Sequence, residues 1–335
     1  MLYITQLFYN SKTIKMYIDN NIILEWIQFL HNRNYSENTI ENYKSDFKIF
    51  LNYIRLSKSD YNISENDINL KAIEGYRTYL SGIETPKTSI YYGINDKLSL
   101  STIRNKITSI KSFLKFLNMI YNIWLDYKRI ETKKIKSDCI EVITEKEYQT
   151  LFNYIGNTEK YRINSLRFQL LINIGYTSGL RLSEMLGLTV GEIKKKETKI
   201  VGKGNKPRRV FFTNSTLSLL EDYLSERANP IPRTWKIEDY SDYTFISHNS
   251  GYDYGLPIKK NTACEIMKKY SDGLDIGKRI TIHSLRHSYA TRLLENWLNI
   301  REIQELLGHS DIQTTENYCH VLRSNLSQKV NQIFE

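Results

Sequence analysis

A glycine and an arginine that lie close together near the middle of the chain could form an anion site. Gly179 is expected to end one helix and Arg181 to begin the next. The amino-terminal end of a helix favours an anion, and a planar guanidinium binds a phosphate through paired hydrogen bonds. The simpler interpretation is an exposed helical arginine that pairs with Glu184, three residues further on. By itself, this segment favours the simpler interpretation.

A second segment with basic side chains runs from His283 to His287 and opens a predicted helix. The three-residue spacing of His283 and Arg286 places both on one helical face, so both could contact one ligand. An imidazole can transfer a proton at neutral pH while an arginine neutralises phosphate charge. The carboxylate of a zinc-binding HExxH motif is missing. Such residues on a surface helix are otherwise simply solvated.

The third segment contains a tyrosine that could act as a nucleophile. Gly308 is expected to close a helix, and Ser310 begins the next one with Gln313 in the capping-box position. Tyr318 then lies about two turns into that helix. A phenol whose proton is removed can attack a phosphodiester and form an ester that is reversed without ATP. Alone, Tyr318 would be a core or interface residue, and His309 a helix cap.

Helices must position most of these residues. Residues 22–56 predict two helices that meet near Ser36, residues 68–80 predict a third, and a fourth begins at Ser99 or Ser101. The apolar positions of the first two helices include Leu24, Ile27, Leu30, Ile40, Phe47 and Ile54.

The second half of the chain is also mostly helical. It opens with a capped helix start at residues 144–147, and only residues 198–212 are strand-like. They predict a hairpin whose turn contains Lys203, between Gly202 and Gly204. The predicted fold class is therefore mainly α with a small β-sheet. We predict an N-terminal extension at 1–20, a helical domain at 21–126, a basic linker at 127–142 and a second domain at 143–335.

Composition limits the class of protein and the partners. The 335 residues carry a formal net charge of +10, which favours an anionic polymer as partner because clustered basic residues release counterions from phosphates. No apolar run is long enough for a membrane span, and the first twenty residues do not have the pattern of a secretion signal. The three cysteines are far apart and suggest neither a disulfide framework nor a thiolate zinc site. We therefore expect a cytoplasmic protein without a membrane partner.

Six of these residues together resemble the active-site pattern of the tyrosine recombinase family, which includes phage integrases and Xer recombinases. The matching positions, in the family's order, are Arg181, Lys203, His283, Arg286, His309 and Tyr318. The resemblance extends from Glu145 to the C-terminus, and the helices at 24–54 and 100–117 look like the family's DNA-clamping domain. It is therefore much more specific than any of the segments taken alone.

The resemblance implies a site-specific recombinase that cleaves and rejoins double-stranded DNA through a 3′-phosphotyrosyl intermediate on Tyr318. It implies that Arg181 and Arg286 hold the scissile phosphate, and that His309 donates a hydrogen bond to it. His283 would help to move the tyrosine proton, and Lys203 would protonate the departing 5′ oxygen. Glu184 would orient the site. Neither a metal nor a nucleotide cofactor is implied.

The family resemblance also implies a homotetramer on two DNA sites, associated with the nucleoid when bound. After Tyr318, apolar residues recur at helical spacing at Leu322, Leu326, Val330 and Ile333. This tail either folds back on its own domain or docks on a neighbouring protomer, and the resemblance favours the second arrangement.

Two other functions use the same kind of fold. A type IB topoisomerase relaxes supercoils as a monomer, but the small helical domain and the short C-terminal tail argue against it. A DNA-binding protein without chemistry is disfavoured by the complete set of six residues.

Overall fold

The computed structural model describes residues 16–56, 58, 62–82, 97–123, 127–132, 142–202, 207–228, 242–248, 255–296 and 298–308. The chain forms two compact units, divided between residues 136 and 137. Lys203, His309, Tyr318 and the predicted C-terminal tail lie outside the described residues. In the described ranges, no helix combines the length and apolar composition that a membrane span requires.

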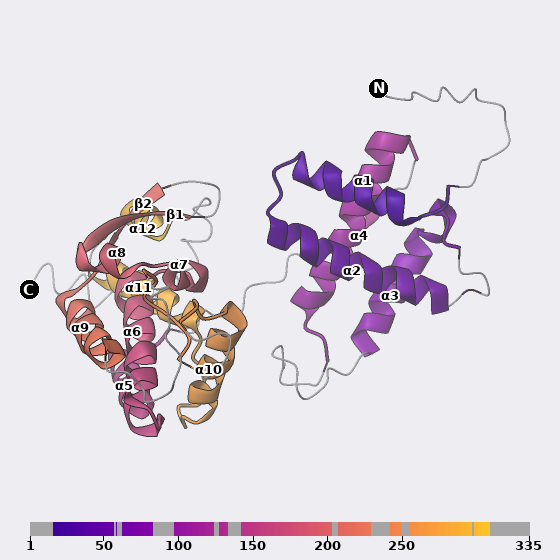
Figure 1. The fold of residues 1–335 in the computed structure, drawn as a ribbon. Coiled ribbons are helices and arrows are strands. Elements are labelled where there is room, and N and C mark those ends of the chain that lie inside the picture. The colour runs from indigo at the N-terminus through magenta and orange to yellow at the C-terminus, as the bar shows by residue number, and fades with distance from the viewer. Residues whose placement is uncertain are drawn as a thin grey trace, which may run out of the picture. The chain divides into compact units, whose positions relative to one another are not determined.

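The first unit is helical. Its elements are α1 (Asn20–His31), α2 (Glu37–Leu56), η1 (Glu65–Asp67), α3 (Leu70–Gly82), α4 (Leu100–Tyr121) and η2 (Tyr127–Arg129), shown in Figure 1. Side-chain caps begin three of the helices, and the sequence predicts those at Ser36 and Ser99. Asp19 accepts a hydrogen bond from the backbone of Ile22, Ser36 accepts one from Thr39, and Ser99 accepts one from Thr102.

Aromatic rings fill the core of the first unit. Trp26 is fully buried, and the ring centroids of Phe47 and Phe113 lie 4.1 Å apart. Leu24, one of the apolar positions that predict the first helix, does not belong to this core and is 61% exposed. The buried face of α1 instead follows a spacing of four residues, through Ile22, Trp26 and Leu30. The indole of Trp26 therefore determines which side of α1 faces the core.

The start of the predicted basic linker packs on the first unit. Ile130 is 1% exposed within that unit's core, and Lys111 donates a hydrogen bond of 3.0 Å to its carbonyl oxygen. Residues 127–132 therefore belong to the packing of the first unit.

The second unit is built around a central helix. Its helices are α5 (Glu145–Thr158), α6 (Arg162–Ser178), α7 (Leu182–Leu186), α8 (Val190–Lys194), α9 (Asn214–Ala228), α10 (Lys260–Asp272), α11 (Ile282–Glu295) and α12 (Ile300–Leu307). Helix α6 is buried along most of its length, with α5, α9 and α11 packed against it (Figure 1). The predicted capping box is present at Thr144 and Glu147, at the start of α5.

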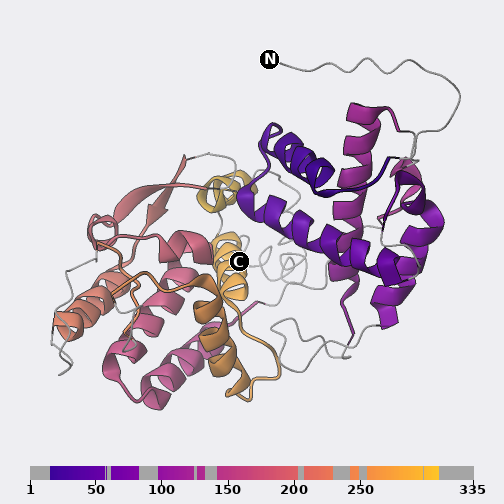
Figure 2. The ribbon, with the colours of Figure 1, turned by 45° about the vertical axis from the view of Figure 1, so that its right-hand side comes forward.

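The predicted hairpin is confirmed. Strands β1 (Glu197–Val201) and β2 (Pro207–Phe211) are antiparallel, and Ile200 is paired with Arg208. Burial alternates along β2, so that Arg208 and Val210 face inward. Helix α12 packs beside β2, as Figures 1 and 2 both show. The fold is therefore mainly α with a small sheet, as predicted.

Candidate functional site

Gly179 makes the sharp turn that presents Arg181. It ends α6 with a φ of +62°, and a Cβ at this position would lie 2.2 Å from Cδ1 of Tyr289. Both the backbone conformation and the closeness of the tyrosine ring therefore require glycine. Arg181 is the N-cap of α7, as the sequence predicts, and its backbone N–H donates to Oε2 of Glu184 at 2.8 Å.

Helix α11 brings the second predicted pair to the same region. Its Thr281 cap places His283 in the first turn, and the His283 ring meets that of His287 edge-on, with centroids 4.2 Å apart. Although His283 reaches the surface, partial removal of water and the positive charges of Arg286 and Arg181 lower the pKa of His283. The imidazole is therefore neutral at neutral pH and able to accept a proton.

Arg286 lies much deeper than His283, with 1% of its surface exposed. It donates to the carbonyl oxygen of Gly179 at 2.6 Å and to that of Leu307 at 2.5 Å. One guanidinium thus connects the turn before Arg181 to the end of α12. Arg286 therefore has a structural role in addition to the one predicted for it.

Three arginines converge on one carboxylate in what we call the Glu184 cluster, consisting of Arg181, Glu184, Arg208 and Arg286. Arg208 forms a fork on Glu184, with contacts of 2.9 Å from Nη1 to Oε1 and 2.6 Å from Nη2 to Oε2. Nη1 of Arg181 lies 2.9 Å from Oε1 of Glu184, and Nη1 of Arg286 lies 3.9 Å from Oε2. Segments that are far apart in sequence therefore share one acid.

The electrostatics of the Glu184 cluster favour an anion. Burial alone would raise the pKa of Glu184, but the hydrogen bonds and charge of Arg208 and the hydrogen bonds of Arg181 lower it to about 2. Glu184 is therefore ionised at neutral pH. Three guanidinium groups and one carboxylate leave a formal surplus of two positive charges. Arg208 and Arg286 are buried while the Arg181 side chain is 31% exposed, so a ligand can reach the surplus charge from the Arg181 side, and a phosphate group would compensate for it.

The neighbours of two further predicted residues border the cluster. Gly202 precedes Lys203, and a Cβ at Gly202 would lie 3.6 Å from both Nη1 of Arg181 and Oε1 of Glu184. Gly308 precedes His309, ends α12 with a φ of +62° as predicted, and accepts a hydrogen bond of 3.3 Å from Nη2 of Arg181. The described residues therefore bring Arg181, His283 and Arg286 together with the chain beside Lys203 and His309.

The Phage integrase family matches residues 141–325, more than half of the chain. Tyrosine recombinase XerD of Oceanobacillus iheyensis is 30% identical over 308 residues, which cover 91% of this chain and 95% of that protein. XerD of Halalkalibacterium halodurans is 29% identical over 306 residues, with coverages of 89% and 93%. The chain is a tyrosine recombinase of the phage integrase family.

The fold of the recombinase agrees with this assignment. XerH recombinase bound to a palindromic difH substrate superposes with a TM-score of 0.61 at 23% identity, covering 95% of this chain and 90% of that one. The family relationship makes this protein a site-specific recombinase.

Sequence reasoning missed Arg208 of the recombinase. A signal was present, because Arg208, Val210 and Phe212 alternate along one face of a predicted strand, and the two apolar residues mark that face as buried. An arginine on that face needs an acidic partner. The sequence does not identify this partner, because Glu184 lies on another element.

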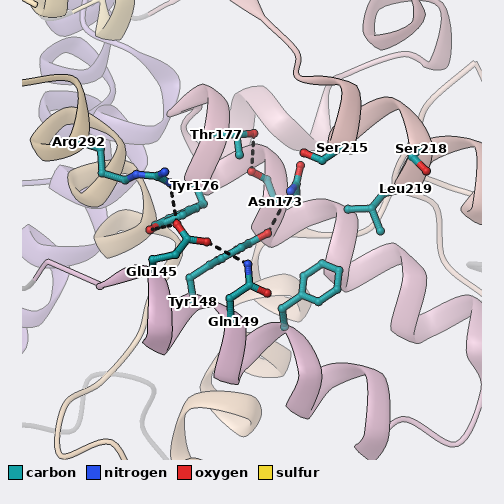
Figure 3. A pocket seen from close by; sticks show the side chains of 11 residues that line it. Glu145, Tyr148, Gln149, Asn173, Tyr176, Thr177, Ser215, Ser218, Leu219 and Arg292 are labelled. Atoms are coloured by element: carbon teal, nitrogen blue, oxygen red, sulfur yellow. Dashed lines mark hydrogen bonds and ion pairs between the residues drawn. The ribbon is translucent and has the colours of Figure 1, made fainter. Parts of the chain in front are cut away.

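A pocket of the recombinase lies beside α5, on the described part of the second unit. The cavity of about 420 Å³ is lined by residues of α5, α6 and α9, together with Arg292 of α11. Tyr148 and Tyr176 stack in its wall with centroids 4.1 Å apart, and Arg292 forms an ion pair of 3.2 Å with Glu145 (Figure 3). Of the predicted catalytic residues that the structure describes, Arg181, His283 and Arg286, none lines this cavity.

Proposed function

We propose that this recombinase cleaves double-stranded DNA by attack of the Tyr318 phenol oxygen on a phosphodiester. The new bond joins that oxygen to phosphorus, and the bond from phosphorus to the 5′ oxygen breaks. The product is a 3′-phosphotyrosyl link and a free 5′ hydroxyl, and the reverse reaction rejoins a strand. The observation that carries the proposal is the Glu184 cluster, because its surplus positive charge suits a phosphate.

Each predicted side chain has a separate task in this reaction. Arg181 and Arg286 stabilise negative charge that develops on the non-bridging oxygens, and His309 donates a further hydrogen bond. The lowered pKa of His283 suits it to accept the tyrosine proton. Lys203 gives a proton to the departing 5′ oxygen. Its role predicts that a 5′-phosphorothiolate substrate, whose sulfur leaves without a proton, relieves the defect of Lys203→Ala.

The proposed partner of both units is duplex DNA. The net charge of +10 supports an electrostatic contribution to binding. The related XerH recombinase was solved bound to its difH substrate, and a lambda integrase dimer with the same fold was solved bound to a core site. The helical first unit would supply DNA contacts in addition to those of the second.

We further propose that four protomers assemble on two sites through the C-terminal tail, residues 319–335. Its apolar stripe needs a covering surface, which a neighbouring protomer would supply. A truncation that ends at Ser324 should keep half-site binding but lose cooperative filling of two half-sites. Undiminished cooperativity in gel shifts on DNA with one and two half-sites would exclude the tail as the assembly element, and loss of half-site binding would favour packing on its own protomer.

The deciding experiment for the chemistry is covalent capture on a nicked suicide substrate. Tyr318→Phe removes only the nucleophilic oxygen, so it should bind the site like the parent protein and form no protein-linked DNA. Protein-linked DNA is measured on a denaturing gel, and half-site binding is measured by gel shift as the control. A normal yield of adduct from the Phe variant would exclude Tyr318 as the nucleophile.

A further inference from the structure

Arg208 is a buried charged residue to which the reaction proposed above gives no task. Its side chain is 3% exposed, and both of its terminal nitrogens are engaged by Glu184. A forked pair of this kind fixes the plane of the carboxylate as well as its position. The geometry at Glu184 therefore depends on a residue of the hairpin.

Arg208 also determines the charge that Arg181 presents. Glu184 accepts two hydrogen bonds from Arg208 and two from Arg181, one of which comes from the Arg181 backbone. These four bonds fill the usual acceptor capacity of a carboxylate. With Arg181 alone, Glu184 would cancel the charge of the phosphate-binding group. Arg208 compensates for Glu184 and leaves the charge of Arg181 for a ligand.

The same guanidinium lies against two glycines that border predicted catalytic residues. A Cβ on Gly308 would approach Cδ of Arg208 to 2.9 Å and its Nη1 to 3.2 Å. A Cβ on Gly202 would lie 3.1 Å from Nη1. Ordinary carbon contacts are longer, so the arginine packs directly on the backbone at both places. The backbone at Gly202, which precedes Lys203, and the backbone at Gly308, which precedes His309, therefore both pack against the Arg208 side chain.

Lysine cannot reproduce this arrangement. An ammonium group retains the charge but is compact, so it cannot form two parallel hydrogen bonds to Glu184. It also lacks the planar guanidinium atoms that pack against Gly202 and Gly308. Nε of Arg208 is buried and has no hydrogen-bond partner among the described residues, so the packing of the guanidinium does not depend on a bond at that atom. Arg208→Lys thus separates charge from geometry.

We propose that Arg208 is a positioning residue of strand cleavage, a role that rests on the proposed function. Through Glu184 it orients Arg181, and through the backbone at Gly202 and Gly308 it fixes the starting points of the chain that carries Lys203 and His309. It does not contact the reacting atoms.

The test compares Arg208→Lys with a matched control, Arg209→Lys, in the full-length protein. Arg209 is the next residue of β2, has a side chain that is 59% exposed and pairs with Glu197. Single-turnover cleavage of a nicked suicide substrate is measured at saturating protein, and half-site Kd is measured separately. Because small misplacements of catalytic groups are costly, Arg208→Lys should slow cleavage by on the order of 10- to 100-fold. Its Kd should stay within about twofold, and Arg209→Lys should cleave within about twofold of the parent.

A double-mutant cycle distinguishes positioning from a general loss of structure. If Arg208 acts through Arg181, Arg208→Lys should slow cleavage less in an Arg181→Ala background than in the parent. Equal slowing in both backgrounds would overturn the coupling to Arg181, and parent-like cleavage by Arg208→Lys would overturn the positioning role. If adduct still forms on Tyr318 in the parent, either result leaves the proposed function intact. An absence of adduct from the parent would overturn both proposals.

Should Arg208→Lys reduce the thermal stability of the second unit, Arg208→Gln provides a second comparison, with an uncharged side chain. It removes the charge and retains a planar polar group. The positioning role requires Arg208→Gln to cleave more slowly than Arg208→Lys, because Glu184 then cancels the charge of Arg181. Faster cleavage by Arg208→Gln than by Arg208→Lys would contradict the role in charge compensation.

Discussion

Two sites in the second unit pair an arginine with a glutamate, and they differ in exposure and in charge. In the Glu184 cluster, the carboxylate side chain is 8% exposed and meets three arginines. In the second site, which we call the Glu145 pair, the Glu145 side chain is 56% exposed and forms one ion pair, with Arg292. Both sites include an arginine of α11, which packs against α6.

We infer from this difference that the Glu184 cluster binds a ligand and that the Glu145 pair does not. The Glu145 pair is neutral and solvated, and ion pairs of this kind contribute little to stability. The Glu184 cluster retains a surplus of positive charge, two of its three arginines are buried, and a fold selected for stability alone would avoid this. The surplus charge is therefore the reason that we propose the active site at the Glu184 cluster, and not at the cavity beside Tyr148 and Tyr176.

The largest effect is expected from removing one arginine of the Glu184 cluster. Arg181→Ala should slow cleavage by roughly 100-fold or more, by analogy with loss of a single oxyanion donor, while half-site binding changes much less. Arg286→Ala should slow cleavage to a similar extent. Because it also removes the hydrogen bonds to Gly179 and Leu307, it should lower the thermal stability more than Arg181→Ala does. Single-turnover cleavage and thermal unfolding measure the two effects. Cleavage within a few-fold of the parent by both variants would refute the phosphate-binding role.

A smaller effect concerns acid stability. The pKa of Glu184 is lowered to about 2 in the folded protein, so its stabilising contribution is full above the ordinary glutamate range and is lost as pH falls towards that value. Between pH 5.5 and 3 the parent should therefore lose more unfolding free energy than Glu184→Gln, by at most about 3 kcal/mol. Urea unfolding at stepped pH tests this. Parallel curves would mean that Glu184 is not the buried, ionised group described above.

Local signals explain why much of the site could be predicted. Gly179 and Gly308 end helices in the left-handed conformation, and Thr144 and Ser99 cap helices as their sequence neighbours indicate. These features depend on a few consecutive residues. The two interpretations of Arg181 are also compatible, because it does pair with Glu184 and yet lies in the cluster.

Tertiary packing explains what could not be predicted. Arg208 and Glu184 are separated by 24 residues and lie on a strand and a helix whose contact no local pattern encodes. The exposure of Leu24 is a similar case. The apolar residues of α1 do not indicate which side of the helix faces the core, and the structure shows that this side carries Trp26. Lys203, His309 and Tyr318 remain sequence predictions because they lie outside the described residues.

The smallest effect is expected at the Glu145 pair. Arg292 shares α11 with Arg286, and its guanidinium lies 4.7 Å from the ring centroid of Tyr176. Arg292→Ala removes that contact and an exposed ion pair, together worth about 1 kcal/mol or less. Cleavage should stay within about twofold of the parent because the neutral pair offers no surplus charge to a phosphate. Arg292→Lys controls for the change of charge on the helix. If Arg292→Ala slowed single-turnover cleavage as much as Arg181→Ala while the protein remained folded, buried charge surplus would no longer distinguish the two sites, and the cavity beside α5 would have to belong to the reaction.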